Sequence, residues 1–166
     1  MASSPRVPPT VRAAAQADLS RILEIERAAA TAAHWTEANY ELAFTSSCPR
    51  RWIFVVESGA SECNSRVDGF LVARSGHPTE WEIENVVVKA SARRLGLGSA
   101  LLGAFVEQAR GSNQNSGPLE VFLEVRESNL AARRLYEKFG FVLDKQRPGY
   151  YRDPEEGAAV YRLIYQ

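Results

Sequence analysis

The chain has 166 residues, 45% hydrophobic and 24% charged, which is the ordinary composition of a globular protein long enough to bury a core. Its 20 basic and 20 acidic residues cancel, so the overall charge directs the chain neither to nucleic acid nor to a membrane surface. No stretch approaches the roughly 20 apolar residues of a membrane span, and the first nine residues lack the apolar core of a signal peptide. We expect a cytoplasmic protein with a flexible leader over residues 1–9 and one domain over 10–166.

The cysteines and histidines are not spaced for metal binding. Cys48 and Cys63 lie in polar segments, and His34 and His77 are isolated from each other. We therefore expect free thiols in a reducing compartment and no metal site.

The N-terminal half is predicted as strand, helix, helix, strand and strand, over residues 10–14, 18–33, 36–44, 52–57 and 67–74. The stripe that predicts the first helix consists of Leu19, Ile22, Leu23, Ile25 and Glu26. Thr36 is a typical N-cap for the second helix. Trp35 lies at the joint between the two helices, where it either anchors their packing or contacts a substrate.

The segment from 80 to 110 organises the chain. It begins after a turn over 75–79, alternates acidic and apolar residues, and continues into three valines, which predicts a strand with a buried end. The second part repeats apolar residues every four positions, at Leu97, Leu101 and Phe105. This spacing predicts an amphipathic helix that ends at Gly111.

Two arginines and two glycines connect this strand to this helix, at Arg93, Arg94, Gly96 and Gly98. A glycine turn that opens a helix presents free N–H groups and the positive end of the helix dipole, which suit an anion such as a pyrophosphate. The alternative is an ordinary strand-to-helix turn with solvated arginines, and the motif alone does not decide between them.

The C-terminal part is predicted as strand, helix, strand, loop and strand, over residues 119–126, 128–139, 141–145, 146–157 and 158–165. In the helix, the expected core face consists of Ala131, Leu135 and Phe139, while Ala132 and Tyr136 share another face. The whole order of elements is most economically packed as an α/β domain, with a mixed sheet covered by helices on both faces.

A carboxylate, an amide and a phenol come together in this part, at Glu124, Asn129 and Tyr136. Their places at a strand end and along the following helix bring them toward the end of the sheet where the glycine turn lies. Open α/β sheets usually bind their ligands there.

Two motifs carry a family resemblance. Arg93-x-x-Gly96-x-Gly98 is similar to the acetyl-CoA pyrophosphate motif of the GNAT N-acetyltransferase superfamily, and the run from Leu123 to Phe141 resembles more narrowly the RimI-type enzymes, which acetylate protein N-termini. The segment from Trp35 to Glu37 and the Tyr150–Tyr151 pair are also similar to that group. The resemblance implies a GNAT-type, mostly antiparallel central sheet from about Thr10 to Tyr165.

The resemblance also implies roles for single residues. Glu124 would be the proton acceptor and Tyr136 the proton donor, while Trp35, Glu82 and Tyr151 would contact the acceptor. Acetyl-CoA would be held by Val86, Val87, Val88, Arg93, Arg94, Leu95, Gly96, Leu97, Gly98, Ser99, Asn129 and Tyr136. Leu95 and Ser99 depart from the family, in which a polar and a basic residue are frequent at these positions. These departures could weaken phosphate contacts without removing the backbone cradle.

The chemistry favours an α-amine as the acceptor. An N-terminal amine has a pKa of ~7.7–8, against ~10.4 for lysine, so a neutral nucleophile costs about 3.5 kcal/mol less to form. A modest base such as Glu124 would then suffice, and Tyr136, with an ordinary pKa of ~10, stays protonated at neutral pH. Glu82 is a rival base, because lysine-directed relatives use a glutamate near this position, and Glu84 shares its face.

Several alternatives stay open at this point. Glu124 could belong to a solvated glutamate row with Glu120, Tyr136 could pack at the edge of the core, and residues 150–152 could form a plain turn or a wall for the acceptor. The leading function is an N-terminal protein acetyltransferase, with a ribosomal protein as one candidate acceptor, as a monomer or homodimer. A small-molecule amine acetyltransferase and a non-catalytic acyl-CoA-binding module are the alternatives.

Overall fold

The computed structural model describes residues 8–45, 49–58, 67–113 and 117–166. Its strands are β1 (Thr10–Ala13), β2 (Arg50–Glu57), β3 (Val67–His77), β4 (Glu80–Val88), β5 (Leu119–Arg126), β6 (Val142–Arg152) and β7 (Glu155–Tyr165). Its helices are α1 (Leu19–Arg27), α2 (Glu37–Phe44), α3 (Leu97–Ser112) and α4 (Leu130–Lys138), with single 3₁₀ turns η1 (Gln16–Asp18) and η2 (Ala90–Ala92). The predicted order of strands and helices is confirmed.

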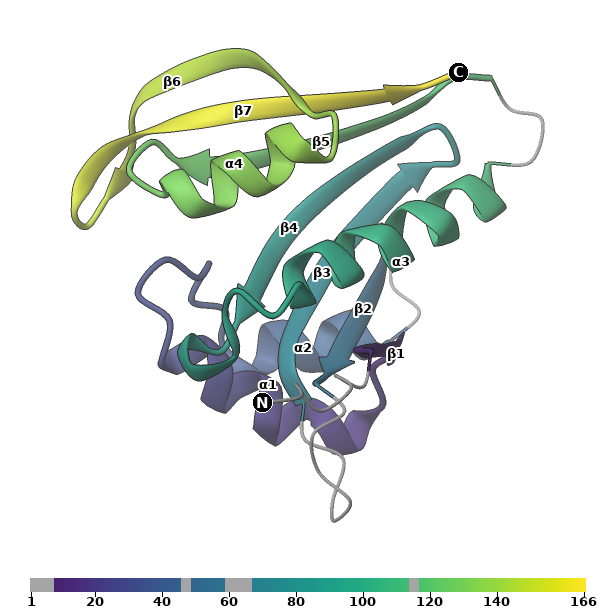
Figure 1. Cartoon of the computed structure of the whole chain (residues 1–166), viewed down its shortest axis with the longest axis vertical. Helices are drawn as coiled ribbons and strands as arrows, with labels where there is room; N and C mark the ends of the chain where they lie inside the picture. The colour runs from purple at the N-terminus through teal and green to yellow at the C-terminus, as the bar shows by residue number, and fades with distance from the viewer. Residues whose placement is uncertain (1–7, 46–48, 59–66, 114–116) are drawn as a thin grey trace, which may run out of the picture.

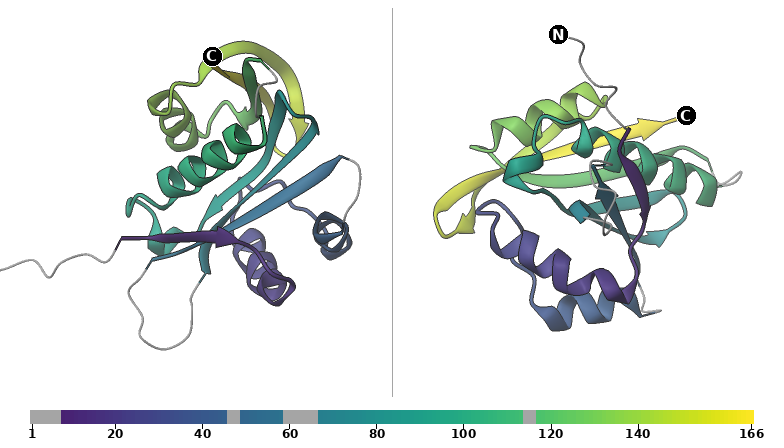
Figure 2. Two further views of the ribbon diagram at one scale, coloured as in Figure 1. Left: turned by 90° about the vertical axis from the view of Figure 1, so that its right-hand side faces the viewer. Right: turned by 60° about the horizontal axis from the view of Figure 1, so that its bottom comes forward.

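The strands form one seven-stranded sheet in the order β1-β2-β3-β4-β5-β7-β6. All neighbours are antiparallel except β4 and β5, which are parallel. Helices α3 and α4 cover one face of the sheet, and α1 and α2 cover the other (Figures 1 and 2). The predicted fold class, a mostly antiparallel sheet between helices, is therefore confirmed.

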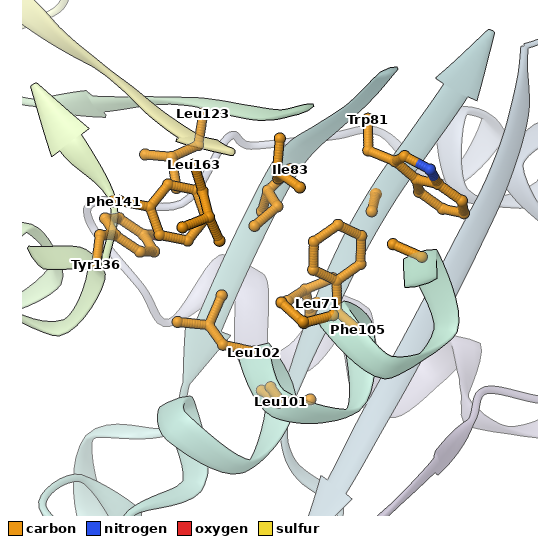
Figure 3. Close-up of a cluster of buried hydrophobic side chains, with 14 of the residues drawn as sticks. Leu71, Trp81, Ile83, Leu101, Leu102, Phe105, Leu123, Tyr136, Phe141 and Leu163 are labelled. Carbon is orange, nitrogen blue, oxygen red and sulfur yellow. The ribbon is translucent and has the colours of Figure 1, made fainter. Parts of the chain in front are cut away.

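Each face of the sheet has its own hydrophobic core. Under α3, the fully buried side chains of Leu101, Leu102 and Phe105 belong to one cluster with Trp81 and Ile83 of β4 (Figure 3). These α3 side chains follow the predicted helical spacing, and each contributes about 1.5–3 kcal/mol by leaving water. On the opposite face, α1 and α2 bury a second cluster against β2 and β3, which includes Ile22, Tyr40, Val55, Phe70 and Val72.

A bulge in β4 switches the face to which its side chains point. Ala73 of β3 pairs with Ile83, but the preceding Val72 pairs with Asn85, so Glu84 is an extra residue. Trp81 and Ile83 therefore face α3, while Asn85 joins the side chains under α1 and α2.

The parallel pair β4–β5 separates part of the way along. Its paired residues run from Glu80–Glu120 to Ile83–Leu123, and then both strands continue without pairing to each other. Figure 1 shows the two strands diverging toward the end of the sheet where α4 lies. Backbone groups of β4 beyond Ile83 are thus left without a strand neighbour on this side.

The largest error of the sequence analysis is the predicted loop over 146–157. These residues mostly belong to the long antiparallel hairpin of β6 and β7, whose turn lies at Asp153–Pro154. Pro148 and Gly149 broke the strand pattern in the sequence. The edge strand accommodates them in an irregularity between Arg147 and Tyr151, where the register with β7 shifts.

Smaller boundaries were also wrong. Helix α3 continues through Gly111 to Ser112, because this glycine keeps a helical conformation instead of the left-handed one that stops a helix. Helix α1 ends at Arg27 rather than near residue 33, and β3 runs through the predicted turn as far as His77. Ala131 of α4 is exposed, because Ala132 takes its place against the core.

Cys48, Cys63 and leader residues 1–7 lie outside the described residues, so the predictions on them are untested. Among the helices that are described, none combines the length and apolar character needed to cross a membrane. Within the same ranges of the chain, no group of three or more His, Cys, Asp or Glu side chains is placed to hold a metal ion.

Candidate active site

A cavity of about 310 Å³ lies where β4 and β5 diverge. Because it passes between the two strands, side chains from both faces of the sheet line it. It collects residues from the α1–α2 connection, β4, β5, α4 and β6. The predicted site residues among them are Trp35, Glu82, Val86, Glu124, Asn129, Tyr136 and Tyr151. The structure therefore brings together the predicted catalytic pair and the predicted acceptor contacts.

The other predicted donor-binding residues do not line this cavity. Val87 and Val88 complete β4, and residues 93–99 form the turn and the first residues of α3. The side chain of Val87 is buried under α1 and α2, so only its backbone could contact a ligand at the opened strand edge.

Glu124 lies on β5 with its side chain about one quarter exposed. Its Oε1 accepts a hydrogen bond from Nη1 of Arg147 on β6, at 2.5 Å. The pKa of the Tyr150 hydroxyl is raised, mainly by its hydrogen bond with Glu124 and to a smaller extent by burial. The carboxylate is thus neither a member of a freely solvated row nor a buried structural group, since it faces the cavity and is engaged by the β6–β7 hairpin.

Tyr136 projects from α4 into the other side of the same cavity. Its ring is buried against Phe141 and Tyr161, with ring centroids 5.8 and 6.3 Å away. Burial, together with the neighbouring Tyr151, raises the pKa of its hydroxyl above the ordinary ~10. The phenol therefore stays protonated across the physiological range, as a proton donor requires.

Asn129 is the N-cap of α4. Its Oδ1 accepts a hydrogen bond from the backbone N–H of Ala132 at 3.2 Å. This bond uses the carbonyl oxygen and leaves the amide N–H groups for a ligand. One side chain can thus start the helix and also contact a bound molecule in the cavity.

The turn before α3 has the geometry of an anion cradle. Gly96 is the N-cap with φ of 81°, in the left-handed region that favours glycine, and no side chain caps the helix. The first-turn N–H groups, from Leu97 to Ser99, have no intrahelical partner by the geometry of any helix. Arg94 is also left-handed, with φ of 61°, which the sequence did not indicate.

Gly98 is required for close packing of two helices and not for an unusual backbone conformation. A Cβ atom at this position would lie 2.8 Å from Cδ2 of Leu135 on α4. The two helices therefore approach closely at this point, and the donor turn is held against the helix that carries Asn129 and Tyr136. Arg93 bends back toward the strand, where its Nε donates to the carbonyl of Val88 at 3.4 Å.

The rival carboxylates on β4 are engaged by arginines of β3 and β2. Glu82 forms an ion pair with Arg74 directly across the β3–β4 pair. Glu84 accepts two hydrogen bonds from Arg51, at 2.8 and 3.1 Å, and is more buried than Glu82. Both line the cavity.

Sequence reasoning missed a buried polar network beneath Trp35. The carboxylate of Glu26 accepts from the side chain of Asn85 at 2.8 Å and from the backbone N–H of Trp35 at 3.0 Å. Asn85 also donates to the hydroxyl of Tyr40 at 3.2 Å. The available signal was a glutamate in an apolar stripe and an asparagine in a valine-rich strand. This network connects the α1–α2 connection to the bulge of β4.

The β6–β7 hairpin closes the cavity with two tyrosines. Tyr150 and Tyr151 meet edge to face with centroids 5.1 Å apart, and the guanidinium of Arg126 lies 4.1 Å above the ring of Tyr151. Arg126 also donates to the carbonyls of Asp153 and Pro154 in the hairpin turn. These contacts support the interpretation of this segment as a wall of the cavity.

A second cavity, of about 460 Å³, adjoins the first. The two share Glu82, Leu123 and Glu124, and the second continues along the open face of the sheet past Phe122. Together they form a groove that begins at the strand opening and runs over β5.

Comparisons with known proteins agree with this geometry. The model of the acetyltransferase (GNAT) family matches residues 19–141. The chain is 33% identical over 150 residues to an uncharacterized N-acetyltransferase of Methanocaldococcus jannaschii, and the alignment covers 88% of this chain and 86% of that protein.

Two comparisons concern ribosomal-protein acetyltransferases. The chain is 34% identical to the ribosomal protein bS18-alanine N-acetyltransferase of Haemophilus influenzae, over 57% of this chain and 60% of that protein. The crystal structure of the corresponding Escherichia coli enzyme superposes with a TM-score of 0.76 at 26% identity, covering 94% of this chain and 93% of that one. For several of the curated relatives it matches, the chain spans only 27% to 60% of the relative's length.

Proposed function

The chain belongs to the acetyltransferase (GNAT) family, and from this premise we propose that it transfers the acetyl group of acetyl-CoA to the N-terminal α-amine of a protein. The transfer is a direct attack in a ternary complex, with Glu124 as the base and Tyr136 as the acid. The family and the named relatives make the chain an N-acetyltransferase rather than a non-catalytic module.

The observation that carries the proposal is the meeting of Glu124 and Tyr136 in one cavity at the opening between β4 and β5. A carboxylate on one strand and a protonated phenol on the next helix face the same space. A binding module needs neither group, whereas an amine-to-thioester transfer needs a proton acceptor and a proton donor.

The proposed chemistry assigns each proton. As the amine nitrogen attacks the thioester carbonyl, Glu124 accepts the proton that the nitrogen loses. Backbone N–H groups at the end of β4 stabilise the oxyanion, because they have no β5 partner there. When the C–S bond breaks, Tyr136 gives its proton to the departing thiolate. The amide product and the free thiol leave, and the two side chains exchange a proton with water to reset.

The acetyl donor, acetyl-CoA, fits the turn before α3. The N–H groups around Gly96 would hold the pyrophosphate, Arg93 and Arg94 would add positive charge, and the amide of Asn129 would bind the pantetheine arm. Leu95 supplies backbone groups only and Ser99 adds an uncharged hydroxyl, which is sufficient for a cradle built from N–H donors. The test of fit is the left-handed Gly96, since a residue with a side chain would be strained there.

The acceptor class follows from the groove and from acid–base chemistry. An acceptor peptide would place its α-amine beside Glu124 and its following residues along the adjoining cavity of about 460 Å³. An α-amine needs about 3.5 kcal/mol less than a lysine to become neutral, so a single carboxylate suffices as a base. Similarity to the ribosomal-protein alanine enzymes supports an alanine-starting protein, such as a ribosomal protein, as the acceptor, and a cytoplasmic location remains our expectation.

The test measures thiol release from acetyl-CoA with short peptides that differ in their first residue, beside spermidine and free lysine. We expect turnover on an alanine-starting peptide and none after its N-terminus is blocked. Turnover on spermidine or lysine alone would instead assign the enzyme to small-molecule amines. Tight acetyl-CoA binding without turnover on any α-amine would overturn the proposal.

A further inference from the structure

The ion pair between Glu124 and Arg147 places a cation of the protein itself on the proposed base. Nη1 of Arg147 lies 2.5 Å from Oε1 of Glu124, and the Arg147 guanidinium also lies 4.2 Å above the ring of Tyr150. The acceptor must bring its nitrogen within hydrogen-bond distance of the same carboxylate. The acceptor and Arg147 therefore compete for the same carboxylate.

The charged groups of β4 and β5 around this carboxylate are engaged with other partners. Arg126 is bound to Glu156, to the hairpin-turn carbonyls and to the ring of Tyr151. On β4, Glu82 and Glu84 have their own partners, Arg74 and Arg51. Arg147 is thus the cation paired with Glu124, and its side chain is half exposed, while Lys145 of β6 lines the adjoining cavity together with Glu124.

The β6 backbone that follows Arg147 is irregular. The β6–β7 register shifts between Arg147 and Tyr151, and the residues within the shift include Pro148, which has no N–H, and Gly149, with φ of 63°. Tyr151 beyond the shift is held under Arg126 and is half-buried. In this segment, only residues 148–150 lie outside the regular pairing with β7, whereas Arg147 pairs with Ala158 and Tyr151 with Glu156. Release of Glu124 therefore needs only a change in the Arg147 side chain, and the wall at Tyr151 stays in place.

On this basis we propose that Arg147 is a placeholder for the acceptor's α-ammonium and so determines acceptor recognition. The inference rests on the proposed function. The α-amine has a pKa of ~7.7–8, so at pH 7 it arrives mainly as a cation and can replace the guanidinium on Glu124. The ammonium then passes one proton through Glu124 to water and becomes the neutral nucleophile, and Glu124 is again ready to accept the proton lost during the attack. A peptide with a blocked, neutral N-terminus cannot make this exchange. Release of Arg147 and arrival of the ammonium are then one step, which favours a cationic amine over a blocked N-terminus and leaves Glu124 paired whenever the site is empty.

The experiment measures peptide binding by calorimetry, with CoA bound in place of the donor so that no reaction occurs. The probe is an alanine-starting peptide, and its N-acetylated form is the blocked control. In Arg147→Gln we expect the free peptide to bind about twofold to fivefold more tightly, the range that half-exposed ion pairs contribute. The blocked peptide should bind equally to both proteins. The gain in free-peptide affinity should vanish when Glu124→Gln is added, because the carboxylate for which Arg147 and the peptide compete is then absent.

A matched control separates this exchange from loosening of the hairpin. Arg162 pairs with Asp144 between β7 and β6, at 3.7 Å, and Arg162→Gln removes the same charge from the same hairpin. That variant should leave peptide binding unchanged. Weaker or unchanged binding of the free peptide by Arg147→Gln would overturn the inference, as would an equal gain for the blocked peptide. These outcomes are distinct from failure of the proposed function, which would show as absent turnover on α-amine peptides by the unaltered enzyme.

Discussion

The donor side and the acceptor side of the cavity are built by different kinds of contact. On the donor side, α3 and α4 pack through Gly98 and Leu135 over a core of fully buried side chains. On the acceptor side, a hairpin strand that is exposed along most of its length is held by arginine pairs and stacked rings. Close packing tolerates little change, whereas half-exposed ion pairs contribute little each and are easily replaced. One fold can therefore keep its chemistry and change its acceptor.

The largest effect should come from the proposed base, where the two sides meet. Glu124→Gln removes the proton acceptor and should lower kcat by about 10²–10⁴-fold, with the KM for acetyl-CoA unchanged. Steady-state kinetics checks this. Glu82→Gln is the matched control, since it removes the rival carboxylate of the same cavity, and it should cost far less. The reverse ranking would assign the base to β4.

Tyr136→Phe should have the next largest effect. The change keeps the buried ring and removes the proton donor, so kcat should fall by about 10²-fold, while the melting temperature changes little. A stable protein with an unchanged kcat would show that the phenol only packs at the edge of the core.

The pH dependence of the reaction provides a second test of Tyr136 as the proton donor. Burial raises the pKa of Tyr136, so its acid form persists to higher pH than an exposed tyrosine would allow. At saturating peptide, kcat should therefore not fall between about pH 8 and about pH 10. A fall near pH 9 would contradict a buried phenol as the acid.

The packing of the donor side predicts a stability effect. Gly98→Ala places a Cβ 2.8 Å from the Leu135 side chain, and should destabilise the fold by about 1–3 kcal/mol and weaken acetyl-CoA binding. Gly103→Ala, in the same helix, meets Phe139 only at 4.0 Å and should stabilise by about 0.5–1 kcal/mol. Denaturant unfolding of both variants checks the pair. Equal effects would mean that the close helix approach is unimportant.

The smallest effect is expected on the acceptor wall. Tyr151→Ala removes the ring under Arg126 and should raise the KM for the peptide about threefold to tenfold, more than the KM for acetyl-CoA. Tyr165, which lies under Arg110 and pairs opposite Leu119 at the far end of β5, offers a matched control. If Tyr151→Ala changes both KM values equally, the hairpin does not form a specific wall.

Local patterns predicted the donor side well. Each of its signals lies within a short segment: the apolar spacing of α3, the alternation of β5 and the glycine turn before α3. The structure agrees with all three. The packing role of Gly98 could not be predicted from the sequence, because the crowding there depends on Leu135, which lies 37 positions further along the chain.

The acceptor side could be predicted only in part. Thr36 capped its helix as expected, but the network of Glu26 and Asn85 joins residues 59 positions apart. The strand over 146–152 was hidden because Pro148 and Gly149 suggest a loop, and only pairing with β7 stabilises the extended backbone. The Arg147–Glu124 ion pair depends on that strand pairing, so no pattern in the sequence near either residue could predict it.

The most direct test of α-amine specificity uses one alanine-starting peptide that also contains a lysine. After reaction with acetyl-CoA, tandem mass spectrometry locates the added acetyl group. We predict acetylation of the N-terminal nitrogen alone, because its amine is neutral at a cost about 3.5 kcal/mol lower than that of lysine. Acetylation of the lysine side chain with a free N-terminus would contradict the account.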